Sequence, residues 1–199
     1  MDTYNFFATV SRMKYIERWA LMRNSREETL SEHSVEVAMI AHALCTIGNI
    51  RYGRNLDAEK AALAGLYHDA SEIITGDMPT PVKYYNDEIR HAYKMVEAVA
   101  VDRLLERLPE DLRPTYEKIF KYNKDDKDEC YMRSLVKAAD KLSALIKCIE
   151  EEKSGNTEFR TAKESTLRTI GSLRMELPEV HDFMEEFMPS YGKTLDELS

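Results

Sequence analysis

An adjacent histidine and aspartate, His68 and Asp69, stand in an apolar segment of the chain, and both side chains are able to bind a metal ion. An ionised carboxylate in apolar surroundings is costly unless a partner compensates its charge, and a cation is one such partner. We expect both residues on a buried helix, where neighbouring side chains point about 100° apart and reach one ion between them. Because a two-residue motif recurs by chance, a pair satisfied by the backbone or by a salt bridge is the alternative.

Two further residues of ligand type, His33 and Asp140, lie in other segments that the sequence predicts to be buried helices. Small residues beside Asp140 allow another helix to approach closely. Two imidazoles and two carboxylates form a mixed nitrogen and oxygen set, which suits Mn, Fe, Co, Ni or Zn. We therefore predict one divalent cation with room for water or a substrate oxygen, and its ligands are His33, His68, Asp69 and Asp140.

Helices must position these residues. The 7 Gly and 6 Pro separate long segments rich in Ala, Leu, Met, Glu, Lys and Arg, which favour helix. Ser31 and Asp57 are natural N-caps, and Gly48 and Gly76 are natural helix ends. No segment alternates with the period of two that a half-buried strand requires. We expect one all-α domain with helices at about residues 5–22, 31–47, 58–75, 87–108, 114–122, 133–152 and 158–176 and a short one from residue 178.

Composition excludes several classes of protein. The formal net charge of −8 argues against binding a nucleic-acid polymer, although one arginine or a metal suffices for a small phosphorylated ligand. The three cysteines form no C-x-x-C pair, which argues against a disulfide framework and fits a cytoplasmic location. No signal peptide and no run of about 18 apolar residues is present, so we expect no membrane association.

The order H…HD…D resembles the pattern of the HD-domain superfamily, which hydrolyses phosphate esters, chiefly of nucleotides. A closer resemblance, to the bacterial HD-domain 5'-deoxynucleotidases, covers nearly the whole chain. Met78 and Lys141 are local departures that leave the chemistry intact. The resemblance is carried by Arg18-Trp19, by residues 31–34, 67–72 and 75–84, by residues 134–137 leading to Asp140, and by residues 187–190.

This resemblance implies a single HD domain over residues 1–199, a helical bundle that hydrolyses deoxyribonucleoside 5'-monophosphates to nucleoside and phosphate. Arg18 would grip the phosphate, Trp19 would leave no space for a 2'-hydroxyl, and Asp77 would accept a hydrogen bond from the 3'-hydroxyl. Glu72 follows the His-Asp pair on the same face of the expected helix and would deprotonate the attacking water. The candidate catalytic residues are Glu72, Arg18 and Asp69. The candidate substrate-binding residues are Arg18, Trp19, His33, Asp69, Asp77, Met78, Pro79, Thr80 and Asp140.

Plainer interpretations stand beside these roles. An arginine such as Arg18 is usually solvated, a lone tryptophan usually belongs to a core, and an aspartate such as Asp77 is a common turn former. We expect Lys83 at the surface. His42 is nine residues after His33, which turns it to the opposite side of the helix and excludes it as a ligand of the same ion.

Two competing functions stay open. An HD phosphodiesterase or nucleoside-polyphosphate hydrolase would need more basic residues to hold additional phosphates. A non-catalytic nucleotide sensor with a structural metal would need no glutamate such as Glu72 near the ion. We expect broad tolerance of the base, selectivity against ribonucleotides and 3'-phosphates, and cobalt, manganese or another first-row metal. Residues 87–108 predict a homodimer, because this amphipathic segment exceeds what a monomer buries.

Overall fold

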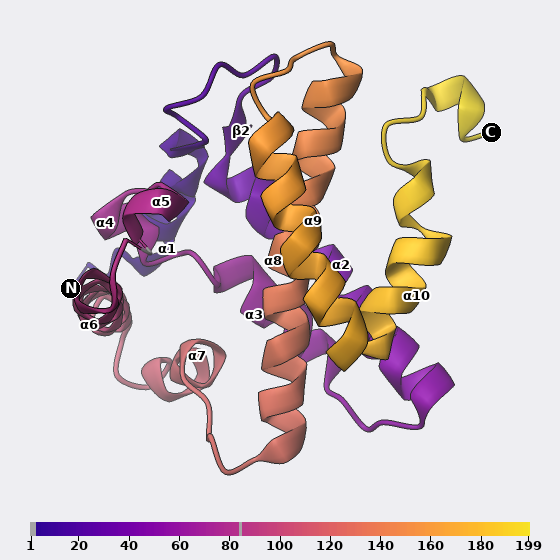
Figure 1. The fold of residues 1–199 in the computed structure, drawn as a ribbon. Coiled ribbons are helices and arrows are strands. Elements are labelled where there is room, and N and C mark those ends of the chain that lie inside the picture. Colours follow the sequence, from indigo (N-terminus) through magenta and orange to yellow (C-terminus); the bar gives the residue numbers. More distant parts are fainter. Residues whose placement is uncertain (1–2, 84) are drawn as a thin grey trace. The chain divides into compact units, whose positions relative to one another are not determined.

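The computed structural model describes residues 3–83 and 85–199, without the side chains of Thr80 and Pro81. Helices dominate the described part, which confirms the predicted all-α class (Figure 1). The expectation of no strand was wrong, because β1 (Glu17–Arg18) pairs antiparallel with β2 (Glu28–Thr29). Strands of two residues are too short to show an alternating pattern in the sequence.

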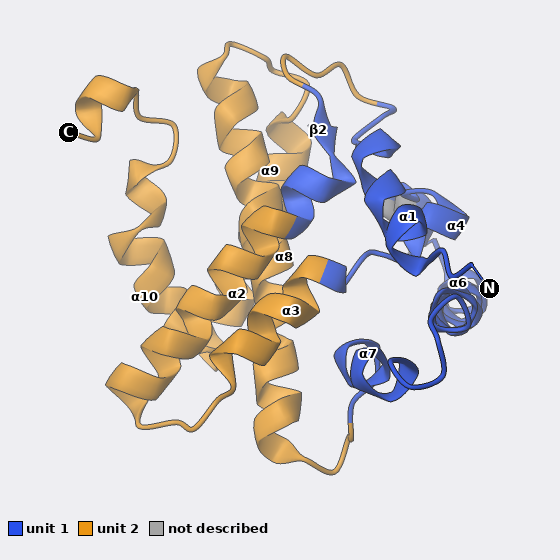
Figure 2. Ribbon diagram, turned by 180° about the vertical axis from the view of Figure 1, so that it is seen from behind, with its two compact units in different colours: residues 1–21, 27–34, 67–122 blue, residues 22–26, 35–66, 123–199 orange. Residues whose placement is uncertain are grey.

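The chain forms two compact units (Figure 2). Unit 1 comprises residues 1–21, 27–34 and 67–122, and unit 2 comprises residues 22–26, 35–66 and 123–199. None of the helices in the described residues is both long and apolar enough to span a membrane. The helices in chain order are α1 (Phe6–Val10), η1 (Ser11–Tyr15), α2 (Leu30–Tyr52), α3 (Ala58–Tyr67), α4 (Glu72–Thr75), α5 (Thr80–Lys83), α6 (Asp87–Leu105), α7 (Arg113–Phe120), α8 (Lys127–Lys153), α9 (Arg160–Glu176), α10 (Pro178–Glu186), η2 (Met188–Ser190) and η3 (Leu195–Glu197).

Unit 1 is built around a small apolar core beneath α1, η1 and α6. Phe6 and Leu104 are buried there, and the Phe6 ring meets the Tyr116 ring edge-on at a centroid distance of 5.1 Å. The helix expected over residues 5–22 was wrong beyond Tyr15. The backbone becomes extended at Ile16, directly before β1. The Ile16 carbonyl accepts the backbone N–H of Leu30, the residue after β2, at 2.8 Å.

Unit 2 is a helical bundle whose core is contributed by α2, α3, α8, α9 and α10. In Figure 1, α8 and α9 run side by side. Helix α2 continues through Gly48 to Tyr52, so the predicted end at Gly48 was wrong. This glycine provides space instead, since a Cβ there would lie 2.8 Å from Glu179 Oε1. Gly53, with a φ of 63°, follows the last helical residue.

Caps define where two helices of unit 2 begin. The side chain of Asp57 accepts the backbone N–H of Lys60 at 2.8 Å, as the sequence predicted. Helix α8 begins six residues earlier than residue 133, because Asp126 accepts the backbone N–H of Glu129 at 3.0 Å and caps it. Side-chain acceptance of an otherwise unpaired N–H is the usual way to start a helix.

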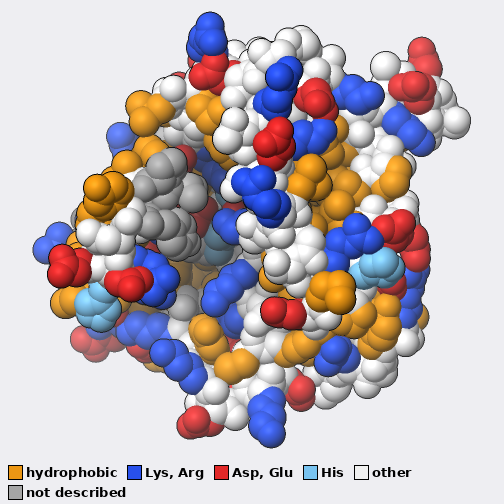
Figure 3. Space-filling view, in the orientation of Figure 1, with side chains coloured by type: hydrophobic (Ala, Val, Ile, Leu, Met, Phe, Trp, Pro, Cys, Tyr) orange, Lys and Arg blue, Asp and Glu red, His pale blue; other side chains and the backbone are white. Residues whose placement is uncertain are grey.

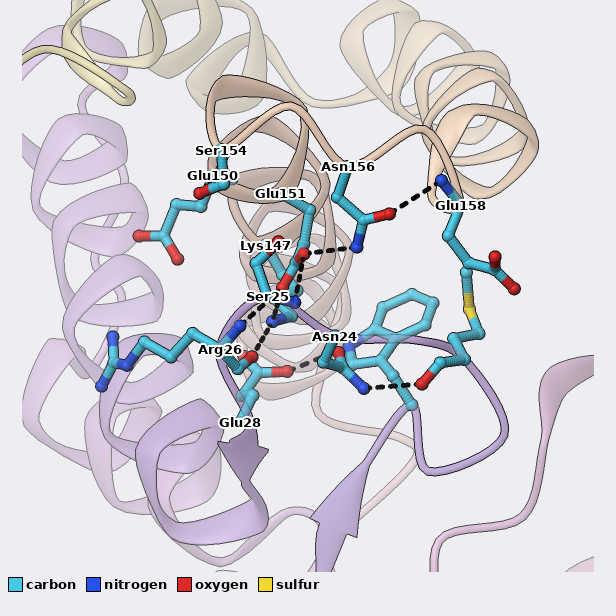
Figure 4. Close-up of polar contacts among 12 residues, drawn as sticks. Asn24, Ser25, Arg26, Glu28, Lys147, Glu150, Glu151, Ser154, Asn156 and Glu158 are labelled. Atoms are coloured by element: carbon cyan, nitrogen blue, oxygen red, sulfur yellow. Dashed lines mark hydrogen bonds and ion pairs between the residues drawn. The ribbon is translucent and has the colours of Figure 1, made fainter.

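A buried ion pair on α8 anchors the segment 22–26 in unit 2. Lys147 donates to the Glu151 carboxylate one turn further along, and both side chains are buried. Glu151 also accepts the Ser25 backbone N–H at 2.8 Å and the Asn156 side-chain amide at 2.7 Å (Figure 4). Burial opposes the ionisation of Glu151, but these hydrogen bonds outweigh it and lower its pKa to about 2.

The close approach of α3 to α2 makes Gly65 a sensitive position. A Cβ on Gly65 would lie 2.9 Å from the Cα of Ala38, a backbone atom that has no room to move. We expect Gly65→Ala to lower the free energy of unfolding by about 1–3 kcal/mol through overpacking. Urea unfolding measures this change. Gly171→Ala on α9 is the control, because nothing lies within 4 Å of its Cβ position. Equal stabilities of the two variants would contradict the prediction.

Glu151 predicts a pH dependence of stability. Its pKa falls from 4.5 to about 2 on folding, so its contribution is complete above about pH 5 and is lost as the pH falls toward 2. We expect the parent to be more stable than Glu151→Gln at pH 7, by a margin that narrows by pH 3. Urea unfolding at both pH values tests this, with Glu164→Gln, an exposed carboxylate of α9, as control. A margin independent of pH would refute this assignment.

Candidate metal centre and active site

His68 and Asp69 lie in a turn of unit 1, which follows α3 and precedes α4. The continuous helix predicted over residues 58–75 was wrong, because α3 ends at Tyr67 and α4 begins at Glu72. The turn is closed by a hydrogen bond from the Glu72 backbone N–H to the Asp69 carbonyl at 2.9 Å. Residues in this turn are not held to the angular spacing of a helix. The side chains of His68 and Asp69 therefore converge, with His68 Nε2 2.9 Å from Asp69 Oδ2.

His33 reaches the same carboxylate oxygen from the first turn of α2. Its side chain is fully buried, and its Nε2 lies 3.8 Å from Asp69 Oδ2. The imidazole rings of His33 and His68 lie 5.2 Å apart at their centroids, and their nearest ligand atoms are within 4.8 Å. Two donors on one ion, each about 2.1 Å from it, lie about 3–4 Å apart. The three side chains therefore fit a divalent cation, whose identity this donor set leaves open.

Asp140 belongs to unit 2. It lies on α8, is half-buried and accepts a hydrogen bond from the neighbouring Lys141 at 2.9 Å. Ala138 and Ala139 beside it are buried, as the sequence predicted for small residues at a close contact. Its part as the fourth ligand stays a prediction.

Glu72 is a buried carboxylate beside the His-Asp turn. Glu72 is the first residue of α4 and does not continue α3. Its carboxylate is nevertheless close enough to Asp69 for the two charges to interact. Burial and the charges of Asp69 and Asp77 raise the pKa of Glu72, while Lys83 and Arg18 oppose them, and the net result is a pKa of about 8. The group therefore changes its protonation near neutral pH, which suits a general base.

Lys83 was expected at the surface, and this was wrong. Its side chain is half-buried, with Nζ 3.9 Å from Glu72 Oε1 and 2.8 Å from Glu97 Oε1. The charge of an amine so placed stabilises the ionised form of Glu72. No local sequence pattern predicts this contact, because Glu97 lies on a different helix, α6.

Arg18 and Trp19 share one partner, Glu28. Arg18 Nη1 donates to Glu28 Oε2 at 2.7 Å, and Trp19 Nε1 donates to the same oxygen at 3.0 Å. Glu28 is the residue that the sequence analysis missed. It stands in a polar segment without a periodic pattern, so only its position across from Arg18 in the strand pair reveals the contact.

Trp19 has a left-handed backbone, and among the described residues it is the one non-glycine residue with a positive φ, at 59°. Such a conformation is strained for a bulky side chain and is typical of functional sites. Asp77 accepts a hydrogen bond from the Trp19 backbone N–H. Burial raises the pKa of Asp77, while the charge of Arg18 opposes this shift. Arg18, Trp19 and Asp77 thus form one polar cluster within unit 1.

The remaining candidates have plainer surroundings. Met78 and Pro79 directly follow Asp77 and are half-buried, whereas the side chain of Thr80 lies outside the described residues. His42 is exposed on α2, as expected of a residue that binds no ion there.

Comparison with known proteins identifies the family. Residues 5–191 match the family model described as 5'-deoxynucleotidase YfbR-like. The chain belongs to this family. It is 49% identical to a 5'-deoxynucleotidase from Erwinia tasmaniensis over 98% of this chain and 96% of the relative. It is 47% identical to the 5'-deoxynucleotidase YfbR from Escherichia coli over 100% of this chain and 98% of the relative. The family and the enzyme class predicted from the sequence motifs are confirmed.

Solved structures agree on the fold. An HD-domain phosphohydrolase from Listeria innocua superposes with a TM-score of 0.80 at 27% identity, over 94% of this chain and 88% of that chain. The HD phosphohydrolase DatZ of cyanophage S-2L, solved with dA and one catalytic Zn²⁺ bound, gives 0.64 at 20% identity, over 94% and 96%. The second likeness shows the fold alone.

The convergent donors predict how metal binding responds to mutation. We expect His68→Ala to weaken binding of Co²⁺ or Mn²⁺ by more than the about 10–100-fold that loss of an outer-shell partner causes. Isothermal titration calorimetry with chelator-treated protein measures it. His42→Ala is the matched control, since it removes an exposed imidazole. If both variants bind the metal as the parent does, the His33, His68 and Asp69 group is an ion pair and not a ligand set.

Proposed function

We propose that this chain is a metal-dependent 5'-deoxynucleotidase, which hydrolyses deoxyribonucleoside 5'-monophosphates to deoxynucleoside and phosphate. One observation carries the proposal most directly. In a member of the YfbR-like family, His33, His68 and Asp69 converge on one point beside the buried Glu72. That arrangement combines a metal-ligand set with a general base, as phosphate ester hydrolysis requires.

His33, His68 and Asp69 would hold the cation, and Asp140 would complete the set from α8. The support for Asp140 is its place in the H…HD…D order and its half-buried position among small residues. When bound, a divalent cation lowers the pKa of a coordinated water and polarises a phosphoryl oxygen. Cobalt and manganese are the first candidates, because imidazole and carboxylate ligands suit both.

Two side chains of unit 1, Glu72 and Arg18, would act on the reacting groups. Glu72 would accept a proton from the attacking water, a role supported by its burial and by its raised pKa. A cation beside Asp69 would favour the ionised, proton-accepting form of Glu72. Arg18 would bind the phosphate with its planar guanidinium and stabilise the charge that develops on it.

Trp19 and Asp77 would select the sugar. The indole would occupy the space of a 2'-hydroxyl, and Asp77 would accept a hydrogen bond from the 3'-hydroxyl. The strained backbone of Trp19 and its hydrogen bond to Asp77 support a positioned recognition element. Met78, Pro79 and Thr80 would line the same edge, where no assigned residue reads a base, so we propose broad base tolerance.

The surface and the cysteines support the remaining proposals. On the face in Figure 3, acidic and basic side chains are interspersed, which fits a small substrate better than a nucleic-acid polymer. Exposed Met95, Val96 and Val99 on α6 support a homodimer. We propose that residues 1–199 act as one HD domain in the cytoplasm, where Cys45, Cys130 and Cys148 would stay free thiols.

Phosphate release tests the function. Chelator-treated protein is assayed with dAMP, AMP and 3'-dAMP, with and without Co²⁺, Mn²⁺, Mg²⁺ or Zn²⁺. We expect metal-restored release from dAMP and little from the other two. Glu72→Gln is expected to lower kcat by about 100-fold or more while metal binding persists, because it removes only the general base.

Three results would contradict parts of this proposal. Equal release from all three substrates would remove the sugar-selecting roles of Trp19 and Asp77. Absence of release with every metal would favour a polyphosphate hydrolase or a nucleotide sensor. Full activity of Glu72→Gln would remove its assignment as the base.

A further inference from the structure

We propose that Glu28 is a positioning residue that sets both phosphate binding by Arg18 and sugar selection by Trp19. The inference rests on the proposed function, because it assigns a support to two residues of that site. It concerns a side chain that would touch neither the cation nor the substrate.

The first argument is the shared acceptor. A single carboxylate oxygen, Glu28 Oε2, accepts Arg18 Nη1 at 2.7 Å and Trp19 Nε1 at 3.0 Å. The side chains of Arg18 and Glu28 are only 11% and 13% exposed, so water competes weakly for this contact. The backbone pairing of Arg18 with Glu28 in the β1–β2 ladder holds the two residues opposite each other. A partly buried, charge-assisted hydrogen bond on paired strands is a stiff support.

The second argument is the strained backbone of Trp19. A bulky residue with a φ of 59° returns to an ordinary conformation unless its surroundings hold it. Two anchors do so from opposite ends of the residue. Glu28 accepts the indole N–H, and Asp77 accepts the backbone N–H. Without Glu28 the ring would lose this hydrogen bond and would sample other rotamers.

The third argument is the geometry of the guanidinium. The guanidinium group is planar. A hydrogen bond that fixes Nη1, together with packing against the indole, therefore restricts the orientation of the whole group. The Arg18 guanidinium carbon lies 5.7 Å from the centre of the Trp19 ring. A phosphate would then meet a guanidinium that is already oriented, and less rotamer freedom would be lost on binding. Glu28 thus connects phosphate binding by Arg18 with sugar selection by Trp19.

The chain offers a direct reporter of this contact. Trp19 is the single tryptophan of the sequence, so tryptophan fluorescence reports on this indole alone. Acrylamide quenching measures how accessible the ring is in the folded protein, with no need for substrate or metal. A role of Glu28 limited to overall stability would leave both the emission maximum and the quenching of the folded protein unchanged.

The experiment compares the parent with Glu28→Ala, Glu28→Gln and a control, Glu27→Ala. Glu27 is exposed and adjacent, and its replacement changes the net charge equally. We expect Glu28→Ala to lower kcat/KM for dAMP by about 10–100-fold, the usual effect of losing a hydrogen bond to a charged group. This loss should arise mainly from a higher KM. The preference for dAMP over AMP should fall by a similar factor, and acrylamide quenching should rise.

Glu28→Gln separates the two parts of the role. Its amide oxygen still accepts the indole N–H, whereas the charge that holds Arg18 is lost. We expect near-parental quenching and sugar preference, with KM for dAMP raised by about 10-fold. This variant also keeps the proposal testable if Glu28→Ala does not fold.

Two outcomes would overturn the proposal. One is a folded Glu28→Ala protein with parental quenching and parental preference for dAMP over AMP. The other is Glu28→Gln with parental KM. Failure of the proposed function looks different, because then the parent itself releases no phosphate, while the quenching comparison still decides whether Glu28 holds Trp19.

Discussion

The crowding of negative charge around one turn is the constraint on which the site depends. Asp69, Glu72 and Asp77 all belong to unit 1, and burial together with their mutual repulsion raises the pKa of Glu72 and Asp77. Such a cluster is stable only where protons or positive charge offset it. Arg18 and Lys83 supply part of that charge, and a divalent cation is suited to supply the rest. The same imbalance that makes the cluster costly favours the binding of a cation there.

The interruption between α3 and α4 brings two of the candidate metal ligands together. A continuous helix would project His68 and Asp69 in different directions, whereas the turn brings His68 Nε2 to 2.9 Å from Asp69 Oδ2. Helix α4 then carries Glu72 and ends before Gly76, whose φ of 74° leads the chain to Asp77. The regular hydrogen bonds of a helix are thus interrupted at the residues whose side chains converge.

Strain on Trp19 is distributed over neighbouring supports. Residues 17 and 18 before it are fixed by the pairing of β1 with β2. A stiff neighbouring segment helps an unfavourable φ to persist. Glu28 then holds the indole N–H of Trp19, and Asp77 holds its backbone N–H.

The sequence by itself determined the all-α class and the helical segments that correspond to α2, α3, α6, α8 and α9, and it indicated His33, His68 and Asp69 as candidate metal ligands. Apolar periodicity and capping residues such as Asp57 act within a few residues, so they are visible in one dimension. Only the tertiary structure decided the turn at residues 68–71, the two-residue strands and the contacts of Lys83 and Glu28. The strands and these contacts join residues ten or more positions apart, which a local pattern of residue types does not record.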